Sequence, residues 1–358
     1  MRLGLLGALA LGLVALLLGG CSTLGYYAQA VNGHMDVMQR ARPVAEVIED
    51  PATPEPLRER LAFSQRLRDF AVAELKLPEG PSYRRYADLG RNAVVWNVVA
   101  APELSLQLKT WCFPVVGCVG YRGYYAQDKA EALAAALRAE GYEVMTYGVP
   151  AYSTLGKLEW MGGDPLLNTF VRGNEADLAR LIFHELAHQV LYVDDDTTFN
   201  ESYATAVERL GLARWVRAHG TDAGWLPAEA ARQARAQAFR AIVARHRDEL
   251  EAVFKGPGDE AARRRDKAAV MARLRAAHEA AKADPASPLA GFTGYDGWFE
   301  RANNASLAVM GAYNDLVPGF ERLFAESGHD FARFHEAVRA LAELPRDERR
   351  RRLSPPTP

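Results

Sequence analysis

Residues 184–188 read HELAH, which places two histidines four positions apart with a glutamate between them. On an α-helix, residues i and i+4 lie on one face, so the rings of His184 and His188 can both reach a single metal ion. The motif therefore requires a helix at this point of the fold. A second segment, NESYA at residues 200–204, offers the Glu201 carboxylate as a third ligand. The two segments together predict a zinc hydrolase site.

The residue types fit the chemistry of a catalytic zinc ion. Such an ion typically takes three protein ligands and keeps one position for water. Bound zinc lowers the pKa of that water from about 15.7 to about 7, so a nucleophile is available near neutral pH. Glu185, next to His184, is the candidate general base that takes the proton of this water. A hydrolase of this kind needs no serine or cysteine nucleophile.

The residues before the motif predict that it lies inside a long amphipathic helix. Asn174 is a good N-cap residue, and Glu175 and Asp177 place acidic groups in the first turn. We expect the two metal-binding helices to occupy residues of about 174–217. The alternative is an exposed helix with two solvated histidines. Apolar residues at helical spacing favour the first interpretation, namely Leu178, Leu181, Ile182, Leu186 and Val190.

The pattern HExxH followed by NExxA resembles the gluzincin metallopeptidases, which include thermolysin and the alanyl-aminopeptidase type. The wider run Phe183–Glu208 also resembles a family of bacterial lipoproteins called predicted aminopeptidases. The resemblance implies a zincin-like α+β fold, mostly helical, with a small β-sheet flanking the metal-binding helix. It implies His184, His188 and Glu201 as zinc ligands and Glu185 as the base of a peptidase, in particular an aminopeptidase acting on peptide substrates.

The third ligand has a rival. Better-known gluzincins have a longer spacing than the twelve residues that separate His188 from Glu201 here. Glu208 lies twenty residues after His188 and is closer to that longer spacing. The flanking Asn200 and Ala204 favour Glu201, since they match the NExxA pattern. Glu201 and Glu208 are seven positions apart and share a helix face, so the glutamate that is not a ligand is expected nearby.

Three classes of function remain open. The first is an active zinc peptidase, and the second is a zinc amidohydrolase or endopeptidase with a narrow substrate. The third is a non-catalytic envelope lipoprotein that keeps a zincin scaffold. The intact Glu185 favours a catalyst, because a purely structural site needs no base. An aminopeptidase also needs an acid that pairs with the free amine of its substrate, and no single acid can be assigned to that task from the sequence.

The N-terminus has the pattern of an export signal. A short charged start is followed by an apolar run from Leu3 to Leu18 and by two glycines, so residues 1–20 are predicted to be a signal peptide. The alternatives to a lipoprotein signal are a plain signal peptide and a membrane helix, although the apolar run is short for a membrane span. Cys21 after the glycines resembles the lipobox of bacterial lipoproteins, which implies a lipid anchor there. By the same resemblance, Ser22 implies the outer membrane, with the protein facing the periplasm.

Two further cysteines, Cys112 and Cys118, lie six positions apart with a proline and a glycine between them. In the oxidising compartment that export implies, they are expected to form a disulfide that closes a small loop. Two buried thiols or a metal-binding pair are the alternatives.

The composition is that of a globular chain with 49% hydrophobic residues among its 358. A single peptidase domain is expected over residues 21–345. The net charge of −2 gives no reason to expect nucleic acid as a partner, and the oligomeric state is not defined by these patterns. The Arg- and Pro-rich tail at residues 346–358 is expected to be disordered. Other expected elements are helices at 26–49, 56–75, 128–140, 228–254 and 259–283, strands at 93–100 and 142–149, and a second strand or hairpin at 109–120.

Residues 303–315 combine small apolar side chains with asparagines and a tyrosine, unlike their Arg-rich neighbours. Polar groups on an otherwise apolar helix can line a pocket. Tyr313 is therefore a candidate donor to the oxyanion that forms when a peptide carbonyl is attacked, a contact worth about 2.7–4 kcal/mol when it is well placed. The alternative is a core tyrosine whose hydroxyl has an ordinary partner.

Overall fold

The computed structural model describes residues 25–354 except for 114–116, 152, 157–158, 195, 221–223 and 311–315. The expected signal peptide, Cys21 and Tyr313 therefore lie outside the described residues. Within the described part of the chain, no helix is both long enough and apolar enough to cross a membrane.

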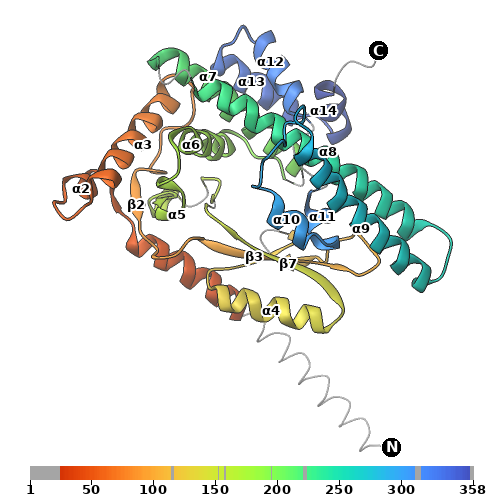
Figure 1. The fold of residues 1–358 in the computed structure, drawn as a ribbon. Helices are drawn as coiled ribbons and strands as arrows, with labels where there is room; N and C mark the ends of the chain where they lie inside the picture. The colour runs from red at the N-terminus through yellow and green to blue at the C-terminus, as the bar shows by residue number, and fades with distance from the viewer. Residues whose placement is uncertain are drawn as a thin grey trace, which may run out of the picture.

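Helices dominate the fold and three small sheets complete it, which agrees with the expected α+β class (Figure 1). The strands are β1 (Arg42–Pro43), β2 (Arg85–Ala87), β3 (Val95–Pro102), β4 (Trp111–Phe113), β5 (Gly117–Val119), β6 (Arg122–Tyr124), β7 (Tyr142–Val149) and β8 (Leu166–Leu167). The helices are residues 25–40, α2 (Val44–Glu49), α3 (Glu55–Ala73), α4 (Gln127–Ala139), α5 (Asn168–Val171), α6 (Glu175–Val190), α7 (Thr197–His219), α8 (Trp225–Lys255), α9 (Glu260–Ala283), α10 (Asp296–Arg301), α11 (Asn304–Val309), α12 (Val317–Glu326), α13 (Phe331–Ala342) and α14 (Arg346–Leu353), with the short 3₁₀ helix η1 at Glu159–Met161.

Most expected elements occur within a few residues of their predicted bounds, but the helix expected at 26–49 is interrupted. It ends at residue 40, the short strand β1 follows, and α2 begins after Pro43. Proline has no backbone N–H to donate and disfavours helical backbone at the residue before it. The apolar spacing alone did not reveal this break.

The largest antiparallel sheet has the strand order β6-β3-β7, with Val98 paired to Thr146 on one side and to Arg122 on the other. Successive side chains of a strand point to opposite faces. Accordingly, Val98 packs with the buried residues of α4, whereas Val99 packs with Ala305 of α11. Helix α4 thus covers one face of this sheet, and α11 covers part of the other.

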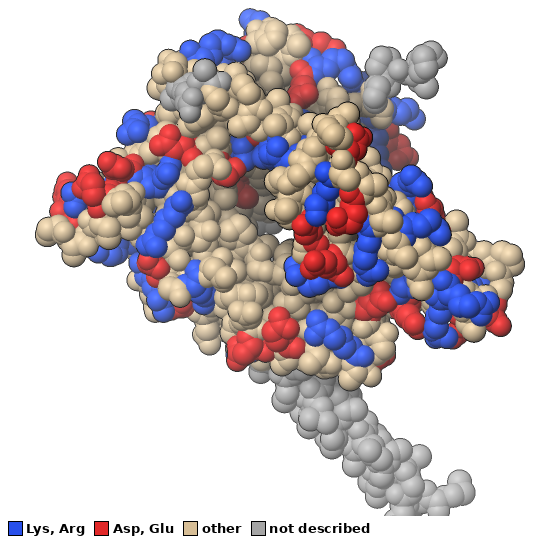
Figure 2. Space-filling view, in the orientation of Figure 1, with Lys and Arg blue, Asp and Glu red and all other residues tan. Residues whose placement is uncertain are grey.

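Helices α6 and α7 lie side by side across the molecule, on the side of the sheet away from α4 (Figure 1). Their apolar faces form the main core together with α3, α12 and α13; its largest members include Leu61, Phe183, Trp215, Phe320 and Phe334. In space-filling view the molecule is hollowed between these two helices and the sheet (Figure 2). This hollow gives the face of α6 and α7 that points toward the sheet a route to solvent.

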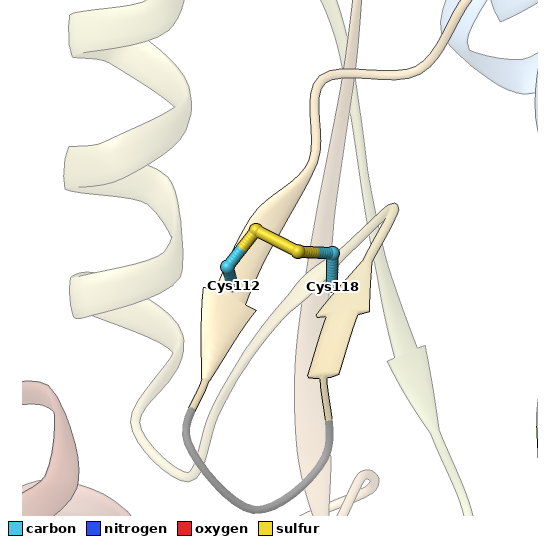
Figure 3. The surroundings of a disulfide bond; sticks show 2 residues. All are labelled: Cys112 and Cys118. Atoms are coloured by element: carbon cyan, nitrogen blue, oxygen red, sulfur yellow. A yellow bond between two sulfur atoms is a disulfide. The ribbon is translucent and has the colours of Figure 1, made fainter.

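Strands β4 and β5 form a hairpin in which Cys112 is directly paired with Cys118. The structure joins the two cysteines by a disulfide (Figure 3). The hairpin contacts the first helix, because the ring of Phe113 stacks on Tyr26 with a centroid separation of 5.1 Å.

The expectation that residues 346–358 form a disordered tail is wrong for 346–353, which form α14. Arg349 on this helix is only 7% exposed. Its Nη2 and Nε donate to Oδ2 of Asp196 at 2.8 and 3.2 Å, and its Nη1 donates to the carbonyls of Ala342 and Leu344. Leu353 is buried in the main core. A run of arginines is usually solvated, but here one arginine has a buried carboxylate as its partner.

Arg349→Ala is expected to lower the free energy of unfolding by about 3 kcal/mol, because it leaves the buried Asp196 carboxylate with the longer 3.9 Å contact to Arg346. Asp196 is 1% exposed, and it also caps α7 by accepting from the Phe199 N–H. Arg351→Ala is the matched control, since Arg351 is exposed and pairs with Glu348 at the surface of the same helix. Urea unfolding of the variants measures the difference. Equal midpoint shifts for the two variants would contradict the role of Arg349.

A buried histidine predicts a pH dependence of stability. Nδ1 of His335 accepts from the Tyr203 hydroxyl at 2.8 Å, and its Nε2–H donates to the Leu75 carbonyl at 2.8 Å. Burial lowers the pKa of His335 from 6.5 to about 4. The neutral form is therefore favoured in the folded state, and below pH 6.5 the unfolded chain binds more protons than the folded one.

We expect the free energy of unfolding to fall by about 3 kcal/mol from this group as the pH drops from 6.5 to 4. His335→Gln should be less stable at pH 7 but should lose that part of the pH dependence. Urea unfolding at pH 7, 5 and 4 compares the variant with wild type and with the exposed-residue control His219→Gln. The same slope in all three proteins would show that His335 is not the source.

Candidate functional site

Helix α6 begins where the sequence predicted. Asn174 is its N-cap and accepts from the Asp177 N–H at 2.7 Å. The helix ends at Val190, and a short connection leads to the N-cap of α7 at Asp196. The Asn200 side chain holds this connection, because it bonds both the N–H and the carbonyl of Val193 at 2.8 and 2.7 Å. Asn200 thus fixes the turn that brings α7 back along α6.

Two histidines of α6 and one glutamate of α7 meet between these helices. Nε2 of His184 lies 3.3 Å from Nε2 of His188 and 3.3 Å from Oε2 of Glu201. Nε2 of His188 lies 3.8 Å from Oε1 of Glu201. A tetrahedral zinc ion with Zn–N distances of about 2.0–2.1 Å holds its ligand atoms about 3.3–3.4 Å apart. The three side chains therefore have the donor types and separations that fit zinc.

Glu208, the rival ligand, does not join this group of three donor atoms and contacts the other side of the His184 ring. Its Oε2 is 3.0 Å from Nδ1 of His184, the ring nitrogen that faces away from the other two residues. A metal-binding histidine usually donates a hydrogen bond from its second ring N–H to a carboxylate, which fixes the orientation of the ring. The geometry thus groups Glu201 with the two histidines and places Glu208 behind His184.

Further charged groups from α8 extend this contact. Nη2 of Arg232 lies 3.7 Å from Oε1 of Glu208. Arg232 is in turn held by two short hydrogen bonds to Glu229, which is 7% exposed and also accepts from Arg180 of α6 at 2.7 Å. Opposite charges therefore alternate from His184 through Glu208 and Arg232 to Glu229. This network ties α8 to the two helices that carry the site.

Glu185 lies beside these residues, on the face of α6 toward the segment between β7 and β8. Burial raises its pKa to about 7, and the negative charges of Glu201 and Asp164 act in the same direction. Burial lowers the pKa of His184, but hydrogen bonds with Glu201 and Glu208 outweigh it and raise that pKa to about 10. Burial and the charge of His184 lower the pKa of His188 to about 4. Without a metal, the site therefore holds its cationic proton on His184.

Two tyrosines, Tyr192 and Tyr121, border the site. The ring of Tyr192 meets that of His188 edge-on, at a centroid distance of 6.0 Å. Burial raises the pKa of the Tyr121 phenol, as do nearby Tyr147, Tyr192 and Glu201. Tyr121 lies between β5 and β6 and is partly exposed, so it borders the site from the sheet side. These phenols and the two imidazoles give the site a largely aromatic rim.

A protein-family model described as "Putative aminopeptidase" matches residues 25–353, which is nearly all of the chain. The chain belongs to this family. No curated protein and no solved structure shows significant similarity to this chain. The match extends over every helix and strand of the described structure, and so it is not limited to the segment of the HExxH motif.

Several site residues of this family member were not found from the sequence. Arg232 and Glu229 lie in a helix that reads as an ordinary charged surface helix, and their role depends on which face of α8 meets α7. Asp164 and Ser153, next to Glu185, come from an irregular segment with no periodic pattern.

Proposed function

We propose that the protein is a zinc-dependent aminopeptidase with a zincin-like fold, in which His184, His188 and Glu201 hold the metal. The observation that carries this proposal is the convergence of Nε2 of both histidines and the Glu201 carboxylate at 3.3–3.8 Å. Family membership supports the choice of peptide substrates. The adjacent Glu185 supports a catalytic site over a purely structural one.

The chain's own residues would divide the work as follows. When bound, zinc supplies Lewis-acid chemistry and lowers the pKa of a coordinated water. Glu185 takes a proton from the attacking water and passes it to the nitrogen of the departing amine. Glu208 accepts a hydrogen bond from Nδ1–H of His184, so that Nε2 of that ring would be unprotonated and available to hold the metal.

Metal analysis joined to a peptide screen tests this proposal. The mature chain should contain about one zinc ion per molecule after purification. Zinc-loaded protein should release the first residue from peptides with a free N-terminus, and removing the metal with a chelator should stop the reaction. A zinc-loaded protein that cleaves no member of a broad library of free and blocked peptides would favour a non-catalytic scaffold.

The location is proposed from the sequence alone. We propose that residues 1–20 are removed and that Cys21 carries the lipid that tethers the mature protein to the periplasmic face of the outer membrane. Cys21→Ala should leave protein that no longer partitions with detergent-extracted membranes. Mass spectrometry of the wild type should show the mass of the attached lipid. Unchanged membrane association of the variant, with no lipid mass on the wild type, would overturn this assignment.

A further inference from the structure

The segment between β7 and β8 contains a buried carboxylate for which the proposed chemistry has no use. Asp164 is 3% exposed. Its Oδ2 accepts from the backbone N–H of Thr154 at 2.9 Å and, more weakly, from the hydroxyl of Ser153 at 3.4 Å. Among the described residues, no lysine or arginine forms an ion pair with it. The side chain of His34 also lies near it, and burial lowers the pKa of that histidine, which favours the neutral ring.

Hydrogen bonds place Asp164 against the face of α6 that carries Glu185. The hydroxyl of Ser82 accepts from the Asp164 N–H at 3.2 Å and from Nε2 of Gln189 at 3.0 Å. Gln189 follows Glu185 by four residues, so the two side chains share one face of the helix. The Ser153 hydroxyl, which contacts Asp164, also hydrogen-bonds with the Glu185 carboxyl, and the negative charge of Asp164 disfavours a second negative charge there. The carboxylate therefore lies close to the candidate base.

The close approach of this segment depends on a glycine. Gly163 has a φ of +67°, and a Cβ at this position would lie 2.5 Å from the backbone nitrogen of Ser82. Any other residue would be strained in this backbone conformation and would push the segment away from Ser82. The backbone thus holds Asp164 in place independently of its carboxylate.

A buried carboxylate without a cation is costly, because its two hydrogen bonds replace only part of the hydration that it loses. A ligand that brings a positive charge to Asp164 offsets this cost. The free α-ammonium group of a peptide is such a charge, and in an aminopeptidase it lies one residue from the bond that is cut. An internal peptide N–H in the same place can donate a hydrogen bond but brings no charge.

We propose that Asp164 binds the free α-ammonium group of the peptide substrate and so limits cleavage to the N-terminal residue. This inference rests on the proposed peptidase function and assigns the amine-binding acid that such a function requires. Glu185 and Asp164 then divide two tasks between neighbouring carboxylates, since one moves a proton and the other holds the end of the substrate.

Peptide binding to a zinc-loaded Glu185→Gln protein tests the proposal without turnover. Isothermal titration would compare trialanine with its N-acetyl form, which has the same backbone but no charge. We expect trialanine to bind about 10- to 100-fold more tightly, the range for a hydrogen bond between charged groups. Adding Asp164→Asn should remove this preference while leaving the zinc content unchanged. Asparagine still accepts from the Thr154 N–H, so the variant removes the charge and keeps the loop contact.

Glu159→Gln, in the same background, is the matched control, because Glu159 is an acid of the same segment that is not placed at Glu185. It should keep the preference for trialanine. Equal binding of the two peptides by the Glu185→Gln protein, including no binding of either, would overturn the proposal. So would a preference that survives Asp164→Asn. The comparison of the two peptides needs only the Glu185→Gln protein, so it remains a test if Asp164→Asn does not fold.

The two proposals fail in different ways. If wild type cleaves no peptide but the preference for trialanine exists and depends on Asp164, the hydrolytic function fails and the amine site stands. If wild type cleaves trialanine and its N-acetyl form at the same rate, the peptidase function stands and the assignment of Asp164 fails.

Discussion

Glu185→Gln is expected to reduce peptide hydrolysis by about 10²–10⁴-fold or more while the protein keeps its zinc. Glutamine has the shape of glutamate but cannot accept the proton of the attacking water. Glu185 is not one of the three residues whose donor atoms converge, so its replacement should leave the metal in place. Initial rates on a free-amine peptide, measured together with zinc content, test the prediction.

Glu175→Gln is the matched control for this variant, because Glu175 is an exposed acid at the start of the same helix. It should retain wild-type rates. Loss of activity in Glu185→Gln through loss of zinc would show instead that Glu185 helps to hold the ion. A fully active Glu185→Gln protein would exclude Glu185 as the base.

The proposed metal ligands predict a graded loss of zinc. His184→Ala, His188→Ala and Glu201→Ala should each lose the ion on dialysis, because two remaining ligands hold it poorly. Glu208→Gln should keep zinc but bind it about 10- to 100-fold more weakly, the usual effect of removing a residue that orients a ligand. Competition with a chromophoric chelator measures these affinities. If Glu208→Gln loses all zinc and Glu201→Ala retains it, the third ligand is Glu208.

The sequence was most informative where local chemistry determines the structure. The N-cap at Asn174 located the start of α6, and the β-branched and aromatic run at 142–149 matches β7. In both segments, side chains close in sequence determine the conformation. The convergence of His184 and His188 follows from the same local rule, since four residues make about one helical turn.

The choice between Glu201 and Glu208 needed the tertiary structure. Their spacing puts both on one face of α7, but two turns separate them by about 10 Å along the helix axis. Only the position of α7 along α6 determines which carboxylate meets Nε2 of the histidines and which meets Nδ1 of His184. That position depends on the turn held by Asn200, whose contacts with Val193 are not evident from composition or spacing.

Dependence on tertiary contacts also explains the errors in the predictions at both ends of the described chain. The arginines of residues 346–353 have the composition of a solvated tail, and the buried partner of Arg349 lies 153 positions earlier in the sequence. At the other end, the apolar spacing through residue 49 concealed the break before Pro43. Asp164 was not singled out from the sequence for the same reason, because its proposed role depends on its position near the helix face that carries Glu185 and Gln189.

The ion pair between Arg349 and Asp196 has a consequence for biosynthesis. A ribosome releases the chain from its N-terminus, so the helix that bears Glu201 emerges long before the arginine that pairs with its capping residue. Until α14 has been made and has docked, Asp196 lacks its buried partner and the start of α7 is not fully secured. The start of the helix that carries Glu201 therefore depends on a segment about 150 residues further along the chain, which links the candidate metal centre to the docking of α14.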